Sequence, residues 1–375
     1  MQVKAKVNYL FLVFPFSLVL YALIAMGKVL PIASGGVGIL NTVVIFALLI
    51  FIYYAKILTG RVFYEAFLLY FPIFFIFTIS SFFSQNVEYT LEKLDGAVFF
   101  PLVITVIISS LANKYSLMEV IKCFILAYLF VLILTLIYKF NLGFWNRNVR
   151  YFINGPIVFG WISSIVSLFS LYIFLEENKR KYLIVFFICV VSVFWTLSKG
   201  PILALLVTLL YLFLSRGFNL RSINVLFLVF SFLSLIYFSE LQQIERLLLV
   251  LDYSSNSDAN YGSVGSRVDL YIDTLRIIND NYLFGVGLGN WQYFNATSFI
   301  YPHNVTLEVF SEIGVIFGFT LVLYLLVVYY YSHAIAKIVM IYFSLALQFS
   351  GDLTYIYFML FIPAVTIICR RNFNI

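Results

Sequence analysis

The amino-acid sequence predicts an all-α integral membrane protein with about twelve transmembrane helices and one large polar loop. Of the 375 residues, 63% are hydrophobic and only 11% are charged, and the mean hydropathy is +1.03. So few polar side chains cannot coat a soluble globule of this size, which excludes a soluble enzyme. Disorder is excluded as well, because a chain this apolar and 20% aromatic gains more from burial than ordering costs.

Apolar runs long enough to cross about 30 Å of hydrocarbon, roughly 20 helical residues each, recur along almost the whole chain. They are centred in 8–26, 36–55, 63–83, 97–112, 118–138, 154–175, 182–198, 201–215, 223–239, 307–331, 336–350 and 353–369. The first run is too long and too aromatic for a secretory signal and has no small-x-small cleavage site, so we expect it to remain as a helix. Residues 1–375 are therefore treated as a single polytopic membrane domain.

The charged residues predict the orientation of these spans. With the N-terminus in the cytoplasm, most Lys and Arg residues fall on the inner side and most acidic residues on the outer side. This pattern favours an even number of spans with both termini cytoplasmic, and it makes the net charge of +6 a topology signal rather than a sign of nucleic-acid binding. The exceptions are the outer-side cations Arg147, Arg150, Lys199, Arg246, Arg267 and Arg276.

Residues 240–306 form the one long hydrophilic stretch, between the ninth and tenth predicted spans. Its first part, 240–251, has the spacing of an amphipathic helix, and 254–265 is a polar linker. Ser266 to Asp269 reads as a capping box that begins a helix ending near Asn279. Gly285, Gly287 and Gly289 follow; their spacing is not GxGxxG and no strand precedes them, so a plain turn is favoured over an anion-binding nest.

His303 lies at the outer membrane boundary, in the tripeptide Pro302-His303-Asn304. An imidazole with a pKa near 6.5 can accept a proton from a sugar hydroxyl, which makes His303 a candidate general base. On position alone, however, an interfacial histidine without a catalytic role is the more common case. His333 serves as its comparison, because it lies beside Lys337 in a short inner loop and reads as a topology residue.

The outer-side cations predict an anion site. Arg267 is in the first turn of its helix, where a cation is unfavourable unless an anion is near, and its guanidinium suits a diphosphate. Arg276 is nine positions further on, on the opposite side of an ideal helix, and could simply pair with Asp273 or Asp280. Lys199, Arg147 and Arg150 are further candidates, although the sequence does not show that these residues converge.

Metal and nucleotide chemistry have no local sequence support. The chain contains no HExxH, GxSxG or Walker motif, and we expect no metal site and no cofactor. Cys123, Cys189 and Cys369 lie in apolar runs without CxxC spacing, so we interpret them as packing residues.

Three stretches within residues 196–318 match motifs of one family, in the same order. Gly265-Ser266-Arg267, the following helix and the run 281–290 are similar to a pattern SGR … P-L-x-G-x-G-x-G. Pro302-His303-Asn304 with Leu307, Glu308, Glu312, Gly314 and Gly318 is similar to HN-x-x-L … E-x-G-x-x-G, and Thr196-Leu197-Ser198-Lys199-Gly200 is similar to T-x-S-R-G. The chain thus resembles the bacterial O-antigen polymerase and O-antigen ligase superfamily. Lys199 departs from the usual Arg and Asn281 from the usual Pro.

The resemblance implies glycan transfer from an undecaprenyl-diphosphate carrier on the periplasmic side of the bacterial inner membrane, without metal or nucleotide. It implies His303 as the base, Arg267 as the loop arginine near the diphosphate and Lys199 as the basic turn residue. The implied partners are the undecaprenyl-diphosphate-linked oligosaccharide, membrane lipid and a chain-length regulator protein, with no nucleic acid. Arg150, Arg147, Arg276 and Asn304 complete the candidate substrate-binding set.

Within the superfamily, a polymerase is favoured over a ligase, because the outer loop is fairly short and the chain is rich in Phe, Tyr, Ile and Asn. A ligase that transfers glycan to lipid A core remains an alternative. A lipid-linked oligosaccharide transporter is a more remote one, since no internal repeat is evident. A non-catalytic envelope scaffold would make His303 and Arg267 dispensable.

Overall fold

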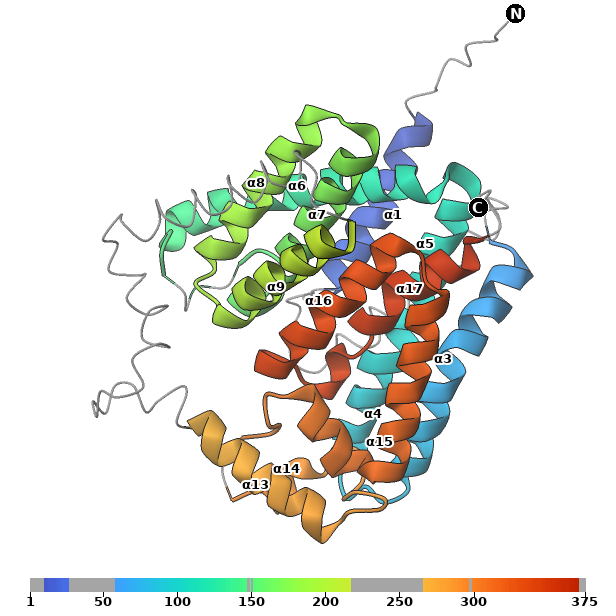
Figure 1. Ribbon diagram of the computed structural model, residues 1–375, viewed down its shortest axis with the longest axis vertical. Helices are drawn as coiled ribbons and strands as arrows, with labels where there is room; N and C mark the ends of the chain where they lie inside the picture. Colours follow the sequence, from blue (N-terminus) through green and yellow to red (C-terminus); the bar gives the residue numbers. More distant parts are fainter. Residues whose placement is uncertain are drawn as a thin grey trace, which may run out of the picture.

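The computed structural model of the protein describes residues 10–26, 58–146, 149, 151–216, 266–296 and 299–370, and within these ranges it is helical and contains no strand. The helices, labelled as in Figure 1, are α1 (Leu10–Met26), α3 (Gly60–Ser81), α4 (Val87–Leu94), the π-helix η1 (Asp95–Phe99), α5 (Phe100–Tyr115), α6 (Leu117–Leu142), α7 (Pro156–Glu177), α8 (Arg180–Trp195), α9 (Lys199–Arg216), α13 (Ser266–Asp280), α14 (Trp291–Phe294), α15 (Val305–Tyr331), α16 (Ala334–Ser350), the 3₁₀-helix η3 (Leu353–Tyr355) and α17 (Phe358–Ile368).

Five described helical segments are long and apolar enough to cross a membrane: Gly60–Ser81, Val87–Tyr115, Leu117–Leu142, Pro156–Glu177 and Val305–Tyr331. Shorter apolar helices occupy Lys199–Ser215, Ala334–Ser350 and Leu353–Ile368. The all-helical membrane class is therefore supported, and a helix lies at each predicted span within the described residues. The predicted spans 36–55 and 223–239 lie outside the described residues, so the total of twelve stays a prediction, as does the outer location of 240–306.

Side-chain caps fix where several helices begin. Thr59, Asn86, Ser116 and Asn304 each accept a backbone N–H from the first turn of the helix that follows, at 3.0 to 3.4 Å. At the other end of α7, Asn178 has a left-handed backbone with φ 55°, a common helix stop. These short polar residues define helix ends that hydropathy alone locates only to within several residues.

The sequence predicted a span beginning near residue 97, but the helix begins ten residues earlier. α4, η1 and α5 form one continuous segment, Val87–Tyr115. Pro101 has no N–H to donate, and the π-helical turn before it re-spaces the hydrogen bonds, with the Phe100 N–H bound to the Asp95 carbonyl. This continuity carries the polar residues of α4 into the helical bundle.

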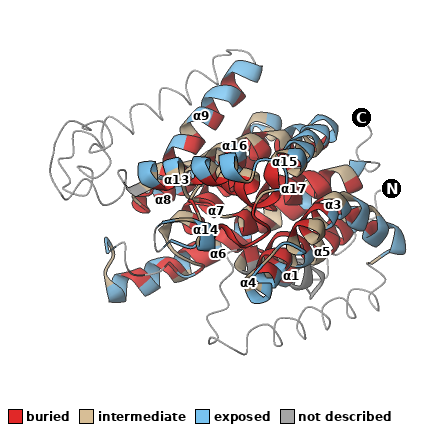
Figure 2. Ribbon diagram, turned by 90° about the horizontal axis from the view of Figure 1, so that it is seen from below, coloured by how far each residue is buried: buried red, intermediate tan, exposed pale blue. Residues whose placement is uncertain are grey.

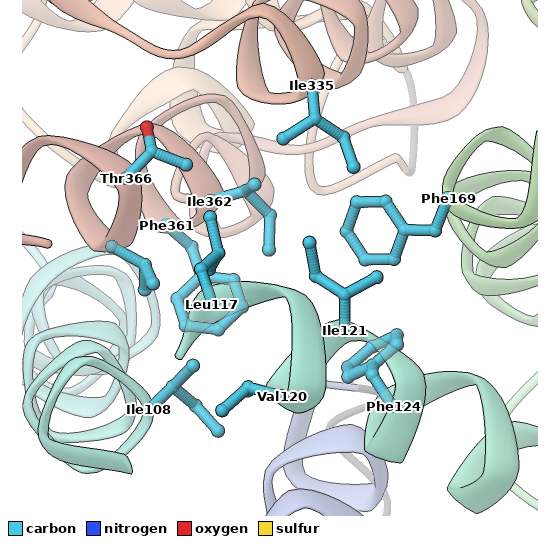
Figure 3. Close-up of a pocket in the computed structure, with 11 residues that line it drawn as sticks. Ile108, Leu117, Val120, Ile121, Phe124, Phe169, Ile335, Phe361, Ile362 and Thr366 are labelled. Carbon is cyan, nitrogen blue, oxygen red and sulfur yellow. The ribbon is translucent and has the colours of Figure 1, made fainter. Parts of the chain in front are cut away.

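The buried core is centred on α7, which is almost wholly enclosed by α6, α8, α9 and α16 (Figure 2). α3, α5, α15 and α17 pack beside one another, and α13 and α14 lie at one end of α15 (Figure 1). An apolar pocket lies between the start of α16 and the second half of α17, and Leu117, Ile335 and Phe361 are among its lining residues (Figure 3).

Candidate active site

His303 lies immediately before α15, in a backbone conformation that is rare for a residue with a Cβ. Its φ is 57°, and the next residue, Asn304, is the N-cap of α15. The imidazole ring packs edge-to-face against Tyr301, with ring centroids 4.4 Å apart, and against Phe299 at 5.6 Å. The two aromatic rings and the helix cap thus hold a half-buried imidazole at the start of α15.

The electrostatic surroundings of His303 come from two other elements. Burial lowers the pKa of His303 below its ordinary value, and the positive charge of Arg267 lowers it further, while Asp352 raises it. Tyr301 responds to the same groups: burial, Asp352 and Glu308 raise its pKa to about 12, and Arg267 opposes them. Arg267 of α13 and Asp352 before η3 therefore both act at His303.

Arg267 and Asn304 meet at the C-terminal end of α16. The Arg267 Nη2 donates to the Ser350 Oγ at 3.4 Å, and the Asn304 Nδ2 donates to the Gln348 carbonyl at 3.2 Å. The hydroxyl of Tyr271, one turn along α13, also donates to the Gln348 carbonyl, at 3.3 Å. These contacts fasten α13 against α16 and bring the predicted arginine to the predicted histidine.

Lys199 reaches the same end of α16 from another direction. It is the first residue of α9, rather than part of a turn, and is partly buried. The next residue, Gly200, lies so close to α16 that a Cβ there would meet the Phe349 Cβ at 2.9 Å. The start of α9 therefore lies against Phe349, the residue before Ser350, which is the hydrogen-bond partner of Arg267. The N-terminus of α9 adds a positive partial charge there.

The remaining predicted cations are not placed at His303. Arg276 is exposed and pairs with Asp273 three residues before it, with 2.6 Å between Nη2 and Oδ1. This is the local ion pair that the sequence offered as the alternative to substrate binding. Arg147 and Arg150 lie outside the described residues.

The three glycines that follow α13 form a turn that binds the protein's own groups. Gly285, Gly287 and Gly289 all have positive φ. The Gly287 N–H binds the Glu312 carbonyl at 2.9 Å, and the Gly289 N–H binds the Glu312 Oε2 at 2.9 Å. The anion at this turn is therefore a side chain of α15, which supports the structural turn that the spacing favoured over a ligand-binding nest.

A buried ion cluster beneath His303 was missed by the sequence analysis. Lys93 of α4 contacts both Glu308 and Glu312 of α15, and all three side chains are fully buried. The charge pattern assigned both glutamates to the outer polar face, but they point inward, where Lys93 near the end of α4 contacts them. The available signal was the pair of acids at i and i+4 in an apolar helix, which requires a cation on a neighbour.

Lys139 is a second buried cation that the sequence analysis did not single out. Its Nζ donates to the carbonyls of Asn146, at 2.5 Å, and Val149, at 3.2 Å, and lies 4.6 Å from the centre of the Tyr151 ring. The Tyr151 hydroxyl donates to the Trp195 carbonyl at 3.1 Å. Lys139 thereby braces the segment after α6 against the end of α8, shortly before Lys199.

Within the part of the chain that the structure describes, no three His, Cys, Asp or Glu side chains are grouped to hold a metal ion. The arrangement around His303 instead combines one imidazole, one carboxylate and one guanidinium. Such a set can accept a proton and stabilise an anion at the same end of the bundle.

A comparison with known protein families gives a match over part of the chain. The family described as O-antigen ligase matches residues 184–324, a segment that includes α9, α13, His303 and most of α15. No curated protein matches the chain. The match supports a membrane-bound, glycosyltransferase-like protein of O-antigen or lipopolysaccharide biosynthesis. The motif resemblance is thereby confirmed over residues 184–324, which are similar to the O-antigen polymerase and O-antigen ligase superfamily.

Proposed function

We propose that the protein is a surface-polysaccharide polymerase of the bacterial inner membrane. It transfers a glycan from undecaprenyl diphosphate to a sugar hydroxyl of another lipid-linked repeat unit, at a site facing the periplasm, with both chain termini in the cytoplasm. The observation that supports this proposal best is the half-buried His303, which lies within the electrostatic reach of Arg267 and Asp352.

The reaction is a single displacement at the anomeric carbon. The acceptor hydroxyl attacks from the face opposite the diphosphate, so the bond from the anomeric carbon to the acceptor oxygen forms as the bond to the phosphate oxygen breaks. His303 takes the hydroxyl proton, and the lowered pKa of its imidazole keeps the base unprotonated at neutral pH. Inversion at the anomeric carbon follows from this geometry.

Arg267 is the residue proposed to stabilise the departing diphosphate. Its guanidinium offers two parallel N–H donors to phosphoryl oxygens, and its hydrogen bond to Ser350 is 3.4 Å long and easily exchanged for a stronger anionic partner. Lys199 and the N-terminus of α9, which lies against Phe349, add positive potential near Ser350. The transfer then needs no metal or nucleotide.

A ligase is the second candidate, because the matching family is described as O-antigen ligase. Donor, base and leaving group are the same in both reactions. The two differ in the acceptor, which is another lipid-linked repeat unit for a polymerase and the lipid A core for a ligase.

The experiment uses purified protein in nanodiscs with a synthetic undecaprenyl-diphosphate repeat unit, without added metal or nucleotide. Products are resolved by gel and by mass. A ladder of products from this donor alone supports the polymerase. Transfer only after lipid A core is added supports the ligase and rejects polymerisation. No transfer to either acceptor, with a donor that a known enzyme accepts, rejects both and favours a transporter.

A further inference from the structure

The buried cluster of Lys93, Glu308 and Glu312 has the contacts of a built, fully satisfied network. The Lys93 Nζ lies 2.6 Å from the Glu308 Oε1, 2.6 Å from the Glu312 Oε1 and 2.7 Å from the Glu312 Oε2. None of the three side chains is exposed to solvent. With one ammonium and two carboxylates, the cluster requires further donors, since a buried carboxylate without partners is strongly unfavourable.

Those donors are backbone N–H groups from segments that carry or adjoin the candidate site. The Gly289 N–H donates to the Glu312 Oε2 at 2.9 Å, and the Trp291 N–H lies 3.4 Å from the Glu312 Oε1. The Leu353 N–H donates to the Glu308 Oε2 at 2.9 Å. The two glutamates therefore bind the glycine turn, the start of α14 and the start of η3 simultaneously.

Each of these segments leads directly to a residue that acts at His303. Leu353 follows Asp352 in the chain. The Trp291 indole Nε1 donates to the Thr274 Oγ1 at 3.0 Å, which connects the cluster to α13, the helix of Arg267. Glu308 itself is in the first turn of α15, and its N–H binds the carbonyl of Asn304, the residue after His303.

We propose that Lys93, Glu308 and Glu312 are positioning residues that hold the start of α15, the turn before η3 and α13 in one arrangement, and so fix His303 relative to Arg267 and Asp352. The catalytic meaning of this role rests on the proposed function. The structural claim does not, because it concerns the surroundings of His303 in the resting protein.

The test measures the titration of His303 directly. The chain has only two histidines, so a protein labelled with ¹³C-histidine gives two imidazole signals, and a His333→Gln variant assigns them. The groups that face His303 are Arg267 from α13, Asp352 from the turn before η3 and the Tyr301 phenol. In Lys93→Met these elements separate, water enters, and the pKa of His303 rises toward its ordinary value by about 0.5 unit or more.

Lys122→Met is the matched control. Lys122 also bridges two glutamates, Glu119 at 2.9 Å and Glu177 at 3.0 Å. It lies near the start of α6, away from the cluster, and its side chain is partly exposed. We expect it to leave the His303 titration unchanged. Lys93→Arg, which keeps the charge, should restore most of the wild-type value.

An unchanged His303 titration in folded Lys93→Met, or an equal shift in Lys122→Met, would overturn the proposal. If Lys93→Met does not accumulate in the membrane, Glu312→Gln gives the same test, because it weakens the cluster while keeping an acceptor for Gly289. No shift of the His303 signal in that variant also rejects the role. In the transfer assay Lys93→Met and Glu312→Gln should lower kcat more than tenfold and leave the donor KM within about threefold. A wild-type protein without transfer activity rejects the proposed function and leaves the titration result standing.

Discussion

His303 has a left-handed backbone, with φ 57°, and this conformation costs a residue with a Cβ about 1–2 kcal/mol. Strained residues of this kind persist where surrounding contacts impose them, often at functional sites. Here the ring contacts with Phe299 and Tyr301 and the capping role of Asn304 impose it. In this conformation the imidazole lies where the charges of Arg267 and Asp352 act on its pKa.

The pH dependence of transfer follows from the surroundings of His303. Because burial and Arg267 lower the pKa of the imidazole, its base form persists below pH 6.5, and the rate should fall only in more acidic buffer. In Arg267→Gln the positive neighbour is removed, so the acid limb should move to higher pH and kcat should fall about 100-fold. Initial rates between pH 4.5 and pH 8, roughly the range in which histidine titrates, measure both effects.

Arg276→Gln is the control for this measurement, since Arg276 is exposed and pairs with Asp273 in its own helix. Its pH profile should match the wild type, with a rate within about threefold, because exposed ion pairs contribute little. A shift of the acid limb in Arg276→Gln, or none in Arg267→Gln, contradicts the assignment of Arg267 as the cation that acts on His303.

At this scale the candidate site residues were easier to find in the sequence than the residues that support them. His303, Arg267 and Asn304 could be found from motif and position, and the structure brings them to one helix end. Lys93 could not, because its partners lie 215 and 219 positions away and pairing over such separations leaves no local pattern. Burial of an ion pair depends on which helices become neighbours.

Among the elements, the glycine turn and the kink in α15 depend on each other. Gly314 interrupts α15 with φ 73° and ψ 177°, and the Val315 N–H binds the Tyr282 carbonyl at 2.9 Å. A Cβ on Gly285 would lie 2.5 Å from the carbonyl atoms of Glu312 and 2.6 Å from the Gly314 N. The sequence showed the glycines, but their partner segment follows only from packing.

Substitution of Gly285 by alanine tests this contact between elements. The left-handed backbone and the backbone collision should together cost more than about 2 kcal/mol, so the midpoint of thermal unfolding in detergent should fall by several degrees. Gly60→Ala is the matched control, because Gly60 starts α3 with nothing within 4 Å of an added Cβ. Equal midpoints for Gly285→Ala and Gly60→Ala would show that the turn is not held against α15.

Helix positions were more predictable than helix junctions. Each apolar run within the described residues became a helix because hydrocarbon requires every backbone group to be bonded within its own segment. The join of α4 to α5 was missed, since the charged residues Glu88, Glu92, Lys93 and Asp95 precede the apolar run. The π-helical turn joins the two helices by changing the hydrogen-bond spacing just before Pro101.

The candidate site and the Lys122 ion pairs lie at opposite ends of the helical bundle. His303, Arg267 and the glycine turn lie at the end of the bundle formed by α13, α14 and the start of α15, shown at the bottom of Figure 1. The Lys122 ion pairs lie at the opposite end of the bundle, with the start of α6 and the end of α7. The proposed orientation assigns the first end to the periplasm and the second to the cytoplasm.

Cysteine labelling in intact cells tests this orientation. In a background with alanine at positions 123, 189 and 369, Tyr293→Cys should react with a membrane-impermeant maleimide, because the Tyr293 side chain is exposed near α13. Glu176→Cys, exposed at the end of α7, should react only after the cells are opened. Labelling of Glu176→Cys alone in intact cells would mean that the site faces the cytoplasm.

The most direct test of the central claim is the steady-state rate of glycan transfer by His303→Ala at saturating donor, measured beside the wild type and His333→Ala. If His303 is the general base, its loss should lower kcat by about 10²–10⁴-fold and leave the donor KM nearly unchanged, while His333→Ala keeps the wild-type rate. An unaltered kcat in folded His303→Ala would contradict the account, because proton transfer from the acceptor would then not pass through this imidazole.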